Sequence, residues 1–196
     1  MLYKILMTEN KLSTEYLDSK KGEIFEIIPE LKYEDGFDQK SSWHIYDVWK
    51  HTEVALSNSN YDFEERLALL LHDIGKPFSY QDDGETRHFK GHAQKSAELA
   101  EPILQRLGYG KQTIERIVFL IKNHATTINT DNINESNIEL IRKLLNIQFC
   151  DTNAYNPKKI APVLQRLNNI KEQLELYTKI YSERQHFKEL NDKSEK

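Results

Sequence analysis

The sequence predicts an all-α fold, a bundle of about seven helices with a short loop or hairpin after its most apolar helix. Apolar residues recur at steps of three and four along successive segments, which is the spacing of one helix face. Helix-start and helix-stop residues separate these segments, and there is no series of alternating strands. The 196 residues, 38% of them hydrophobic, are enough for one domain with its own core. We expect this domain over residues 1–187, with its core in about 27–155, followed by a disordered charged tail at 188–196.

The most apolar helix lies near the middle of the chain. Asp62 and Glu65 form a capping box directly before the run Leu67–Leu71. Gly75 and Pro77 end the helix, because glycine permits a left-handed end and proline cannot continue the hydrogen-bond ladder. A helix that is apolar nearly all round is expected at the centre of the bundle.

The other elements follow from similar signals. Residues 1–42 are expected to form a short helix or two and a loop, and the Asp83-Gly84 pair predicts a loop or small hairpin. A capping box that begins at Ser136 and an N-cap at Asn156 precede the last two helices. The remaining helices are expected at residues 44–56, 92–107, 112–124, 138–150 and 158–187.

The composition narrows the class of partner and the compartment. Interleaved charges, 27 basic and 31 acidic, give a net charge of -4 and no positive field that would hold a long nucleic acid. Any nucleotide ligand should be small or bound locally. No apolar run is long enough for a membrane span and the N-terminus lacks a secretory signal, so we expect a cytoplasmic protein without a membrane partner. A single cysteine, Cys150, excludes an internal disulfide and a thiolate metal site.

The adjacent pair His72-Asp73 ends the apolar helix, where two polar groups are costly to bury without partners. Imidazole and carboxylate are good ligands for borderline divalent ions, and neighbouring residues at a helix end can both turn toward one point. Taken alone, the pair could equally cap the helix in solvent, since a two-residue motif arises readily by chance.

Four further residues strengthen the metal interpretation. His51, His92, His124 and Asp151 each lie on, or near the end of, a different expected helix. A single histidine most often packs at a half-buried position with one hydrogen bond. Six ligand-type residues on successive helices instead match the way helical bundles build metal sites. The nitrogen and oxygen donors suit one or two ions of manganese, iron, cobalt, nickel or zinc, and suit magnesium less well.

The order of these residues resembles a known family. His51, then His72-Asp73 within Leu-His-Asp-Ile-Gly-Lys, then Asp151 is similar to the His, His-Asp, Asp pattern of the HD superfamily of metal-dependent phosphohydrolases. His92 and His124 match the two additional histidines of many members. The resemblance implies a helical HD domain that hydrolyses phosphomonoesters or phosphodiesters.

A wider resemblance covers roughly residues 27–155. These residues look like the HD region of bacterial CCA-adding tRNA nucleotidyltransferases. The sequence shows no Gly-Ser motif followed by paired aspartates, which marks the nucleotidyltransferase head of that family, so nucleotide addition is not expected. The similar segments are Ile28–Leu31, Gly36–Gln39, His44, Asp47–Trp49 and Arg87–His92.

The HD resemblance implies how the ligands would work. Asp73 could bridge from the first metal to a second held by His92 and His124, and two ions would clamp the phosphoryl oxygens and activate a water. With one ion only, His92 and His124 would face the phosphate as proton donors or charge stabilisers. The residues expected to hold the first metal are His51, His72, Asp73 and Asp151.

Four residues are candidates for substrate binding. Lys76 lies three residues after Asp73 and could offset charge in the transition state, although a solvated lysine at a helix end is equally compatible. Arg87 and Lys95 flank His92 in the sequence and could bind phosphate or ribose oxygens, although a solvated charge is the commoner role. The resemblance places His44 in the pocket.

Three functions remain open at this point. The complete ligand set favours a hydrolase that acts on a nucleotide or an RNA terminus, such as a 2',3'-cyclic phosphate, with nucleoside monophosphates as the alternative substrate. A non-catalytic metal-dependent module that binds a nucleotide or tRNA end is the second function. A structural bundle with incidental histidines is the third and predicts no effect of chelation on stability. The oligomeric state is unknown.

Overall fold

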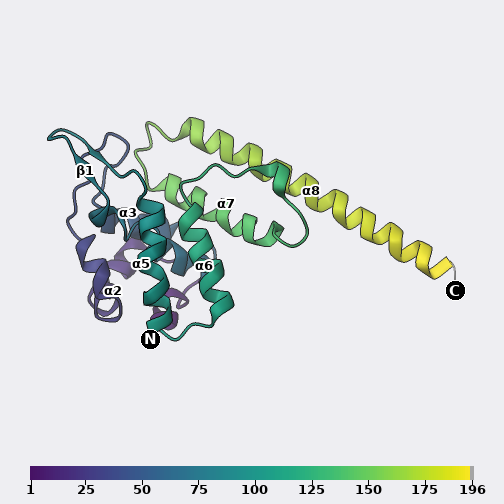
Figure 1. Ribbon diagram of the computed structural model, residues 1–196, viewed down its shortest axis with the longest axis horizontal. Helices are drawn as coiled ribbons and strands as arrows, with labels where there is room; N and C mark the ends of the chain where they lie inside the picture. The colour runs from purple at the N-terminus through teal and green to yellow at the C-terminus, as the bar shows by residue number, and fades with distance from the viewer. Residues whose placement is uncertain (195–196) are drawn as a thin grey trace.

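The computed structural model describes the backbone of residues 1–194 and the side chains of residues 1–183, and its fold is helical (Figure 1). The described part contains eight α-helices, close to the seven that the sequence predicted. They are α1 (Leu2–Leu6), α2 (Thr14–Ile27), α3 (Val48–Ser57), α4 (Phe63–Leu71), α5 (His92–Arg106), α6 (Lys111–Asn123), α7 (Ile138–Asn153) and α8 (Ala161–Ser194). Short 3-10 helices lie at Pro29–Tyr33, Lys76–Phe78 and Thr130–Asn132. The expected hairpin consists of β1 (Gln81–Asp82) and β2 (Arg87–His88), which pair antiparallel.

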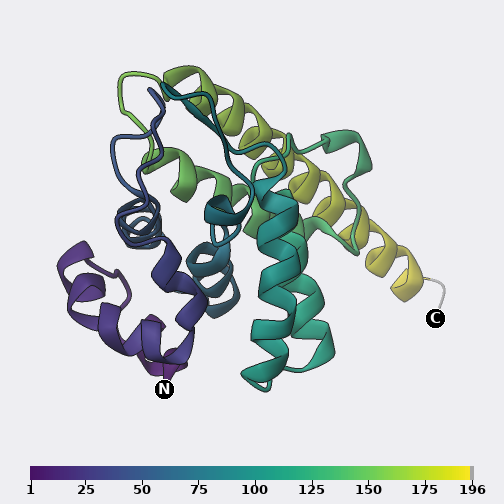
Figure 2. The ribbon, with the colours of Figure 1, turned by 60° about the vertical axis from the view of Figure 1, so that its left-hand side comes forward.

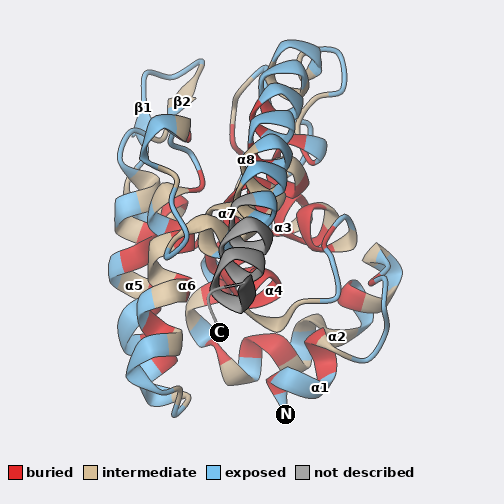
Figure 3. Ribbon diagram, turned by 90° about the vertical axis from the view of Figure 1, so that its right-hand side faces the viewer, coloured by how far each residue is buried: buried red, intermediate tan, exposed pale blue. Residues whose placement is uncertain are grey.

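Helix α4 is the central element, as its sequence predicted. Asp62 caps its start by accepting a hydrogen bond from the backbone N–H of Glu65. Every residue of the run Leu67–Leu71 is fully buried, and burial of a leucine side chain stabilises a fold by about 1.5–3 kcal/mol. Helices α1, α3, α6 and α7 all contact α4. Figure 3 shows the buried residues on the inward faces of these helices.

Helices α5 and α6 form a helical hairpin, and the two helices lie side by side (Figures 1 and 2). Gly91 precedes α5 with a φ of 83°, a left-handed conformation that favours glycine. The segment after α4 passes close to the start of α5 at Gly75, where a Cβ atom would lie 2.5 Å from the backbone nitrogen of Ser96. Because Gly75 has no side chain, the segment after α4 can lie against the first turns of α5. The C-terminal end of α4 therefore lies next to the N-terminal end of α5.

The long helix α8 packs on α7 near its start and then extends away from the other helices in Figure 1. It continues past Phe187 to Ser194, into the charged segment for which the sequence predicted a disordered tail. After Pro162 this segment contains no glycine or proline to stop a helix. Residues 195–196 lie outside the described residues. No helix in the described part of the chain has the length and apolar character required to cross a membrane.

Local hydrogen bonds correct two expected helix starts and one expected cap, while α7 begins at Ile138 as predicted. Helix α3 begins at Val48 because the Asp47 side chain accepts from Lys50 N–H, so His44 lies in the preceding loop. The Ser136 hydroxyl donates to Asn134 instead of capping α7. Asn156 ties a turn to the loop of residues 42–43, and α8 starts only at residue 161.

The reason proposed for Gly75 is also wrong. Its φ is -81°, which any residue adopts, so no left-handed helix end requires glycine here. The requirement comes from the close approach of Ser96, whose hydroxyl accepts a hydrogen bond from Gly75 N–H over 2.9 Å.

Candidate metal centre

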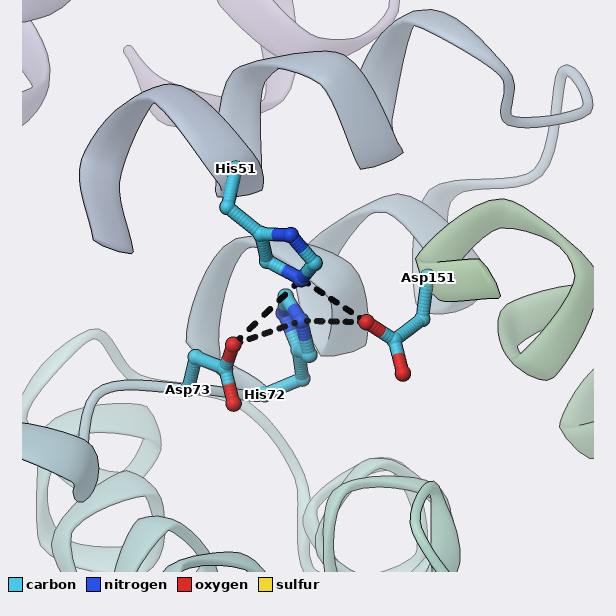
Figure 4. A group of neighbouring side chains, drawn as sticks. All are labelled: His51, His72, Asp73 and Asp151. Atoms are coloured by element: carbon cyan, nitrogen blue, oxygen red, sulfur yellow. Dashed lines mark hydrogen bonds and ion pairs between the residues drawn. The ribbon is translucent and has the colours of Figure 1, made fainter. Parts of the chain in front are cut away.

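Five helices bring six His and Asp side chains together. One lies on α3, two follow α4, one is the first residue of α5, one follows α6 and one lies on α7. Four of the six converge in Figure 4 from two helices, α3 and α7, and from the turn after α4. In that order the six residues are His51, His72 with Asp73, His92, His124 and Asp151.

The first group of potential ligands contains four fully or almost fully buried residues. His51 Nε2 lies 2.8 Å from Asp151 Oδ1 and 3.5 Å from Asp73 Oδ2. His72 Nε2 lies 3.2 Å from the same Asp73 oxygen and 3.5 Å from Asp151 Oδ1. Two imidazole nitrogens and two carboxylate oxygens therefore surround one point, an arrangement that could hold a metal ion.

The second group shares Asp73 with the first. Its other oxygen, Oδ1, lies 3.4 Å from His92 Nε2 and 3.7 Å from His124 Nε2. The two Nε2 atoms lie 3.1 Å from each other. Asp73 thus presents one oxygen to each pair of histidines.

Backbone carbonyl groups orient all four rings. His72 Nδ1 lies 2.6 Å from Leu69 O and His124 Nδ1 lies 2.7 Å from Ile121 O, each three residues earlier in the chain. His92 Nδ1 is similarly 2.8 Å from Phe89 O, and His51 Nδ1 is 3.3 Å from Ala154 O. A ring that donates its Nδ1 proton presents the Nε2 lone pair, which is the form that binds metal.

Several polar atoms of the cluster have no hydrogen-bond partner with suitable geometry. They are His72 Nε2 and both carboxylate oxygens of Asp73, all buried. Unsatisfied buried polar atoms are costly, and a cation placed among them would remove this cost. The donors present, nitrogen and oxygen without sulfur, therefore fit a borderline divalent ion.

The electrostatics of the cluster also favour a cation. Burial opposes ionisation of Asp73, but the charges of His72 and Lys76 lower the pKa of its carboxyl well below the usual value. Burial is likewise outweighed at His72, where Asp73 and Asp151 raise the pKa of the ring to about 10. The two carboxylates thus hold a proton on a buried imidazole, in a place where a metal ion would supply the positive charge instead.

Lys76 lies beside these six residues and is only 2% exposed. Its ammonium nitrogen lies 2.7 Å from Asp73 Oδ2 and donates to Gln39 Oε1 over 2.8 Å. It also lies 3.3 Å from His44 Nε2. Burial, and then the positive charge of Lys76, lowers the pKa of His44 to about 3, so this ring is neutral.

The other two candidates for substrate binding have partners outside the cluster. Arg87 donates to Asp82 Oδ2 over 2.9 Å and to the backbone oxygen of Asp38, and its guanidinium stacks on Phe37. Lys95 pairs with Glu98 at 3.6 Å. The structure therefore brings Lys76 and His44 to the metal ligands, whereas Arg87 is engaged in the hairpin and Lys95 along α5.

Sequence reasoning missed three residues that support the cluster. Tyr155 donates its hydroxyl to Asp151 Oδ2 over 3.0 Å, one helical turn after that residue, so the spacing could have revealed it. The side-chain N–H groups of Gln148 donate to the carbonyl groups of Asn123 and Thr126, which lie on either side of His124. No sequence signal singles out this contact.

Glu34 is the third residue that sequence reasoning missed. It is fully buried, and its Oε2 accepts a hydrogen bond from the Thr52 hydroxyl over 3.3 Å while its Oε1 has no partner. Burial, together with the negative charge of Asp73, raises the pKa of Glu34 well above its usual value. Glu34 therefore favours its protonated form more strongly than an exposed carboxyl group does.

Comparison with known proteins identifies a matching family model and several similar proteins. The family model described as HD domain matches residues 44–173. An A-adding tRNA nucleotidyltransferase from Deinococcus radiodurans is 32% identical over 139 residues, which are 65% of this chain and 32% of that protein. A CC-adding tRNA nucleotidyltransferase from Thermus thermophilus is 35% identical over 104 residues, which are 50% of this chain and 24% of that protein. The similar segment is thus a third or less of each relative.

Proposed function

Because the chain belongs to the HD domain family, we propose that it is a metal-dependent phosphohydrolase that cleaves a phosphomonoester or phosphodiester of a nucleotide or RNA terminus. The observation that carries this proposal is the position of Asp73. Its Oδ2 faces the Nε2 atoms of His51 and His72, and its Oδ1 faces those of His92 and His124. A carboxylate between two pairs of imidazoles is suited to bridge two divalent ions.

The ligands would be divided between two ions. Asp151 completes the first group and lies near the first two histidines. The donor set suits manganese, iron, cobalt, nickel or zinc, and suits magnesium less well. When bound, the ions would supply Lewis acidity toward the phosphoryl oxygens and a water of lowered pKa for attack on phosphorus.

The geometry favours ligand roles for His92 and His124 over roles as proton donors. Each ring already donates its Nδ1 proton to a backbone carbonyl group. Burial, and then the charges of His72 and His92, lowers the pKa of His124 to about 3, and burial also lowers the pKa of His92. Neutral rings with Nε2 lone pairs bind cations but have no second proton to give to a leaving oxygen.

Lys76 has two tasks in this proposal. Its ammonium partly neutralises Asp73, at 2.7 Å, and is itself fixed by Gln39. It also adds positive charge beside the ligands, where a phosphoryl group gains negative charge during hydrolysis. His44 Nε2, 3.3 Å from the same nitrogen, lines this part of the site.

The RNA terminus is suggested by the relatives. The two proteins described above are named for addition of nucleotides to tRNA. An RNA 3' end or a 2',3'-cyclic phosphate is therefore the substrate class that we favour, with nucleoside monophosphates next. The same names also support the second candidate function, a non-catalytic module that binds a tRNA end through the metal cluster.

The test is hydrolysis of adenosine 2',3'-cyclic phosphate, a nucleoside monophosphate and a generic phosphodiester by the purified chain with manganese, cobalt, nickel or magnesium. Asp73→Ala removes the shared ligand, and Asp131→Ala, at an exposed position outside the cluster, is the matched control. Elemental analysis of each protein gives its metal content.

We expect metal-dependent turnover that is lost in Asp73→Ala and kept in Asp131→Ala. Turnover that persists after chelation would overturn the hydrolase proposal. Retained metal without turnover of any ester would favour the binding module, and absence of metal from the wild-type chain would exclude both candidate functions.

A further inference from the structure

We infer that a pocket beside the metal cluster binds a second phosphate group, adjacent to the phosphate that is cleaved. This inference rests on the proposed phosphohydrolase function and specifies its substrate. The pocket has a volume of about 450 Å³ and lies between the start of α5 and the end of α6. These two helix ends carry His92 and His124, the histidines of the second ligand group.

The pocket adjoins the cluster at His92, which belongs to both. This residue lines the pocket, and its Nε2 lies 3.4 Å from Asp73 Oδ1. Asn123 and Ala125, on either side of His124, also line the pocket. A phosphoryl group at the second ligand group would therefore lie next to this pocket.

The charge of the lining fits an anion. Lys90 and Lys122 line the pocket and are exposed, and no aspartate or glutamate lines it. Among the described side chains, neither lysine has an ion pair within 4.0 Å, in contrast to Lys95, which pairs with Glu98. Two unpaired ammonium groups in a pocket without carboxylates are suited to a phosphate, whose oxygens accept charge-assisted hydrogen bonds.

The wall from α6 is held in place. Gln148 on α7 donates to the carbonyl group of Thr126 over 2.6 Å and to that of Asn123 over 3.3 Å. Phe89, on the other side, has Lys76 Nζ 5.4 Å from its ring centre. A pocket whose walls are fixed before binding loses less entropy when a ligand enters.

The pocket thus selects a class of substrate. A nucleoside 2',3'-cyclic phosphate or a nucleoside monophosphate has no second phosphate and would leave the two lysines without a partner. An oligonucleotide that ends in a 2',3'-cyclic phosphate or in a 3'-phosphate has a preceding phosphodiester. The shared chemistry is a phosphate next to the scissile one, and the two kinds of end can be compared directly.

Kinetics with matched substrate pairs test the inference. One pair is a nucleoside 2',3'-cyclic phosphate and a dinucleotide that ends in the same group, and the other is a nucleoside 3'-monophosphate and a dinucleotide that ends in the same 3'-phosphate. In at least one pair, kcat/KM should be about tenfold or more higher for the substrate with the second phosphate. Lys90→Ala and Lys122→Ala should each reduce this ratio, whereas Lys111→Ala, at the opposite end of α6 and 90% exposed, should leave it unchanged.

A binding measurement separates this inference from the proposed function. Inorganic pyrophosphate, titrated into the full chain, should shift the backbone amide NMR signals of residues 90–94 and 122–126. Lys122→Ala should weaken this binding and Lys111→Ala should not. Hydrolysis with equal kcat/KM within both pairs, or pyrophosphate binding that ignores Lys90 and Lys122, would overturn the inference and leave the hydrolase proposal standing. Pyrophosphate binding at the pocket without turnover of any ester would show a phosphate site there, but it would contradict the hydrolase and with it the assignment of a phosphate adjacent to a cleaved one.

Discussion

The Nε2 atoms of His92 and His124 lie 3.1 Å apart in the cluster. Both rings are anchored through Nδ1 to backbone carbonyl groups, so in their neutral forms both Nε2 atoms carry lone pairs. Two lone pairs at this distance repel each other unless a cation or a proton lies between them. Burial, and then the charges of His72 and His92, lowers the pKa of His124 to about 3, which disfavours a proton at neutral pH. A metal ion between the two Nε2 atoms would satisfy both lone pairs.

The first prediction concerns the number of metal ions. The wild-type chain, loaded with manganese or zinc and desalted, should retain about two ions per chain, and the double variant His92→Ala/His124→Ala about one. Chelation should lower the melting temperature of the wild-type protein, because the folded state alone presents these ligands together. His88→Ala removes a histidine whose side chain is 62% exposed and serves as the control. Equal metal content in the wild type and the double variant would contradict the two-ion arrangement.

The second prediction concerns Tyr155, whose hydroxyl donates to Asp151 Oδ2 over 3.0 Å. Tyr155→Phe should weaken metal affinity by about 10-fold to 100-fold, because hydrogen bonds to ligand carboxylates orient them. The free energy of unfolding of the metal-free protein should fall by only about 1 kcal/mol. Tyr61→Phe, which removes a hydroxyl bonded to Met7 O, is the matched control for calorimetric metal titration. An unchanged affinity in Tyr155→Phe would show that Asp151 needs no such support.

The third prediction concerns the close approach at Gly75. A Cβ atom there would lie 2.5 Å from Ser96 N and 2.7 Å from His92 O, both backbone atoms that cannot move without shifting α5. Gly75→Ala should lower the free energy of unfolding by about 1–3 kcal/mol, the usual cost of overpacking. It should also reduce metal retention, because a shift of α5 would move its first residue, His92, which is a proposed metal ligand.

Gly22→Ala is the matched control for this substitution. Gly22 lies within α2 with nothing within 4 Å of an added Cβ. This variant should be more stable than the wild type by about 0.5–1 kcal/mol, because alanine loses less backbone entropy in a helix. Urea unfolding of both variants gives the comparison, and a Gly75→Ala protein as stable as the wild type would contradict the packing argument.

The fourth prediction concerns the pH dependence of stability in the metal-free protein. Burial and Asp73 raise the pKa of Glu34 well above its usual value, so the folded state keeps this proton at pH values where the unfolded state has lost it. Stability from this group is present below the usual carboxyl pKa and falls as pH rises toward the raised folded value. Glu34→Gln cannot titrate and should escape this loss.

The difference in free energy of unfolding between Glu34→Gln and the wild type should therefore grow with pH. Its slope should approach about 1.4 kcal/mol per pH unit within the window between the two pKa values. Urea unfolding in chelator at several pH values from 5 to 8 measures the difference, in which the titration of groups distant from Glu34, shared by both proteins, cancels. A difference that does not change with pH would show that Glu34 ionises normally.

Much of the fold was predictable because it depends on local chemistry. The apolar run Leu67–Leu71 and its Asp62 cap predicted the central helix, and the structure confirms both. One boundary and one cap were predicted wrongly because another local contact formed instead. Asp47 caps α3, so His44 lies before that helix, and Ser136 bonds to Asn134 although α7 begins at the predicted residue. Such competition between side chains is invisible to periodicity alone.

The helical class and the six residues that could serve as metal ligands can be predicted from short segments of the sequence, because helix periodicity, caps and ligand chemistry are local properties. The packing of the helices is needed to show that Asp73 presents a different oxygen to each histidine pair and that Lys76 is buried against it. The packing also explains why Arg87 pairs with Asp82 in the hairpin, why the pKa of Glu34 is raised by burial and Asp73, and why the Tyr155 hydroxyl donates to Asp151. These relationships join residues on separate elements, so they depend on how the helices pack, and no single segment contains that information.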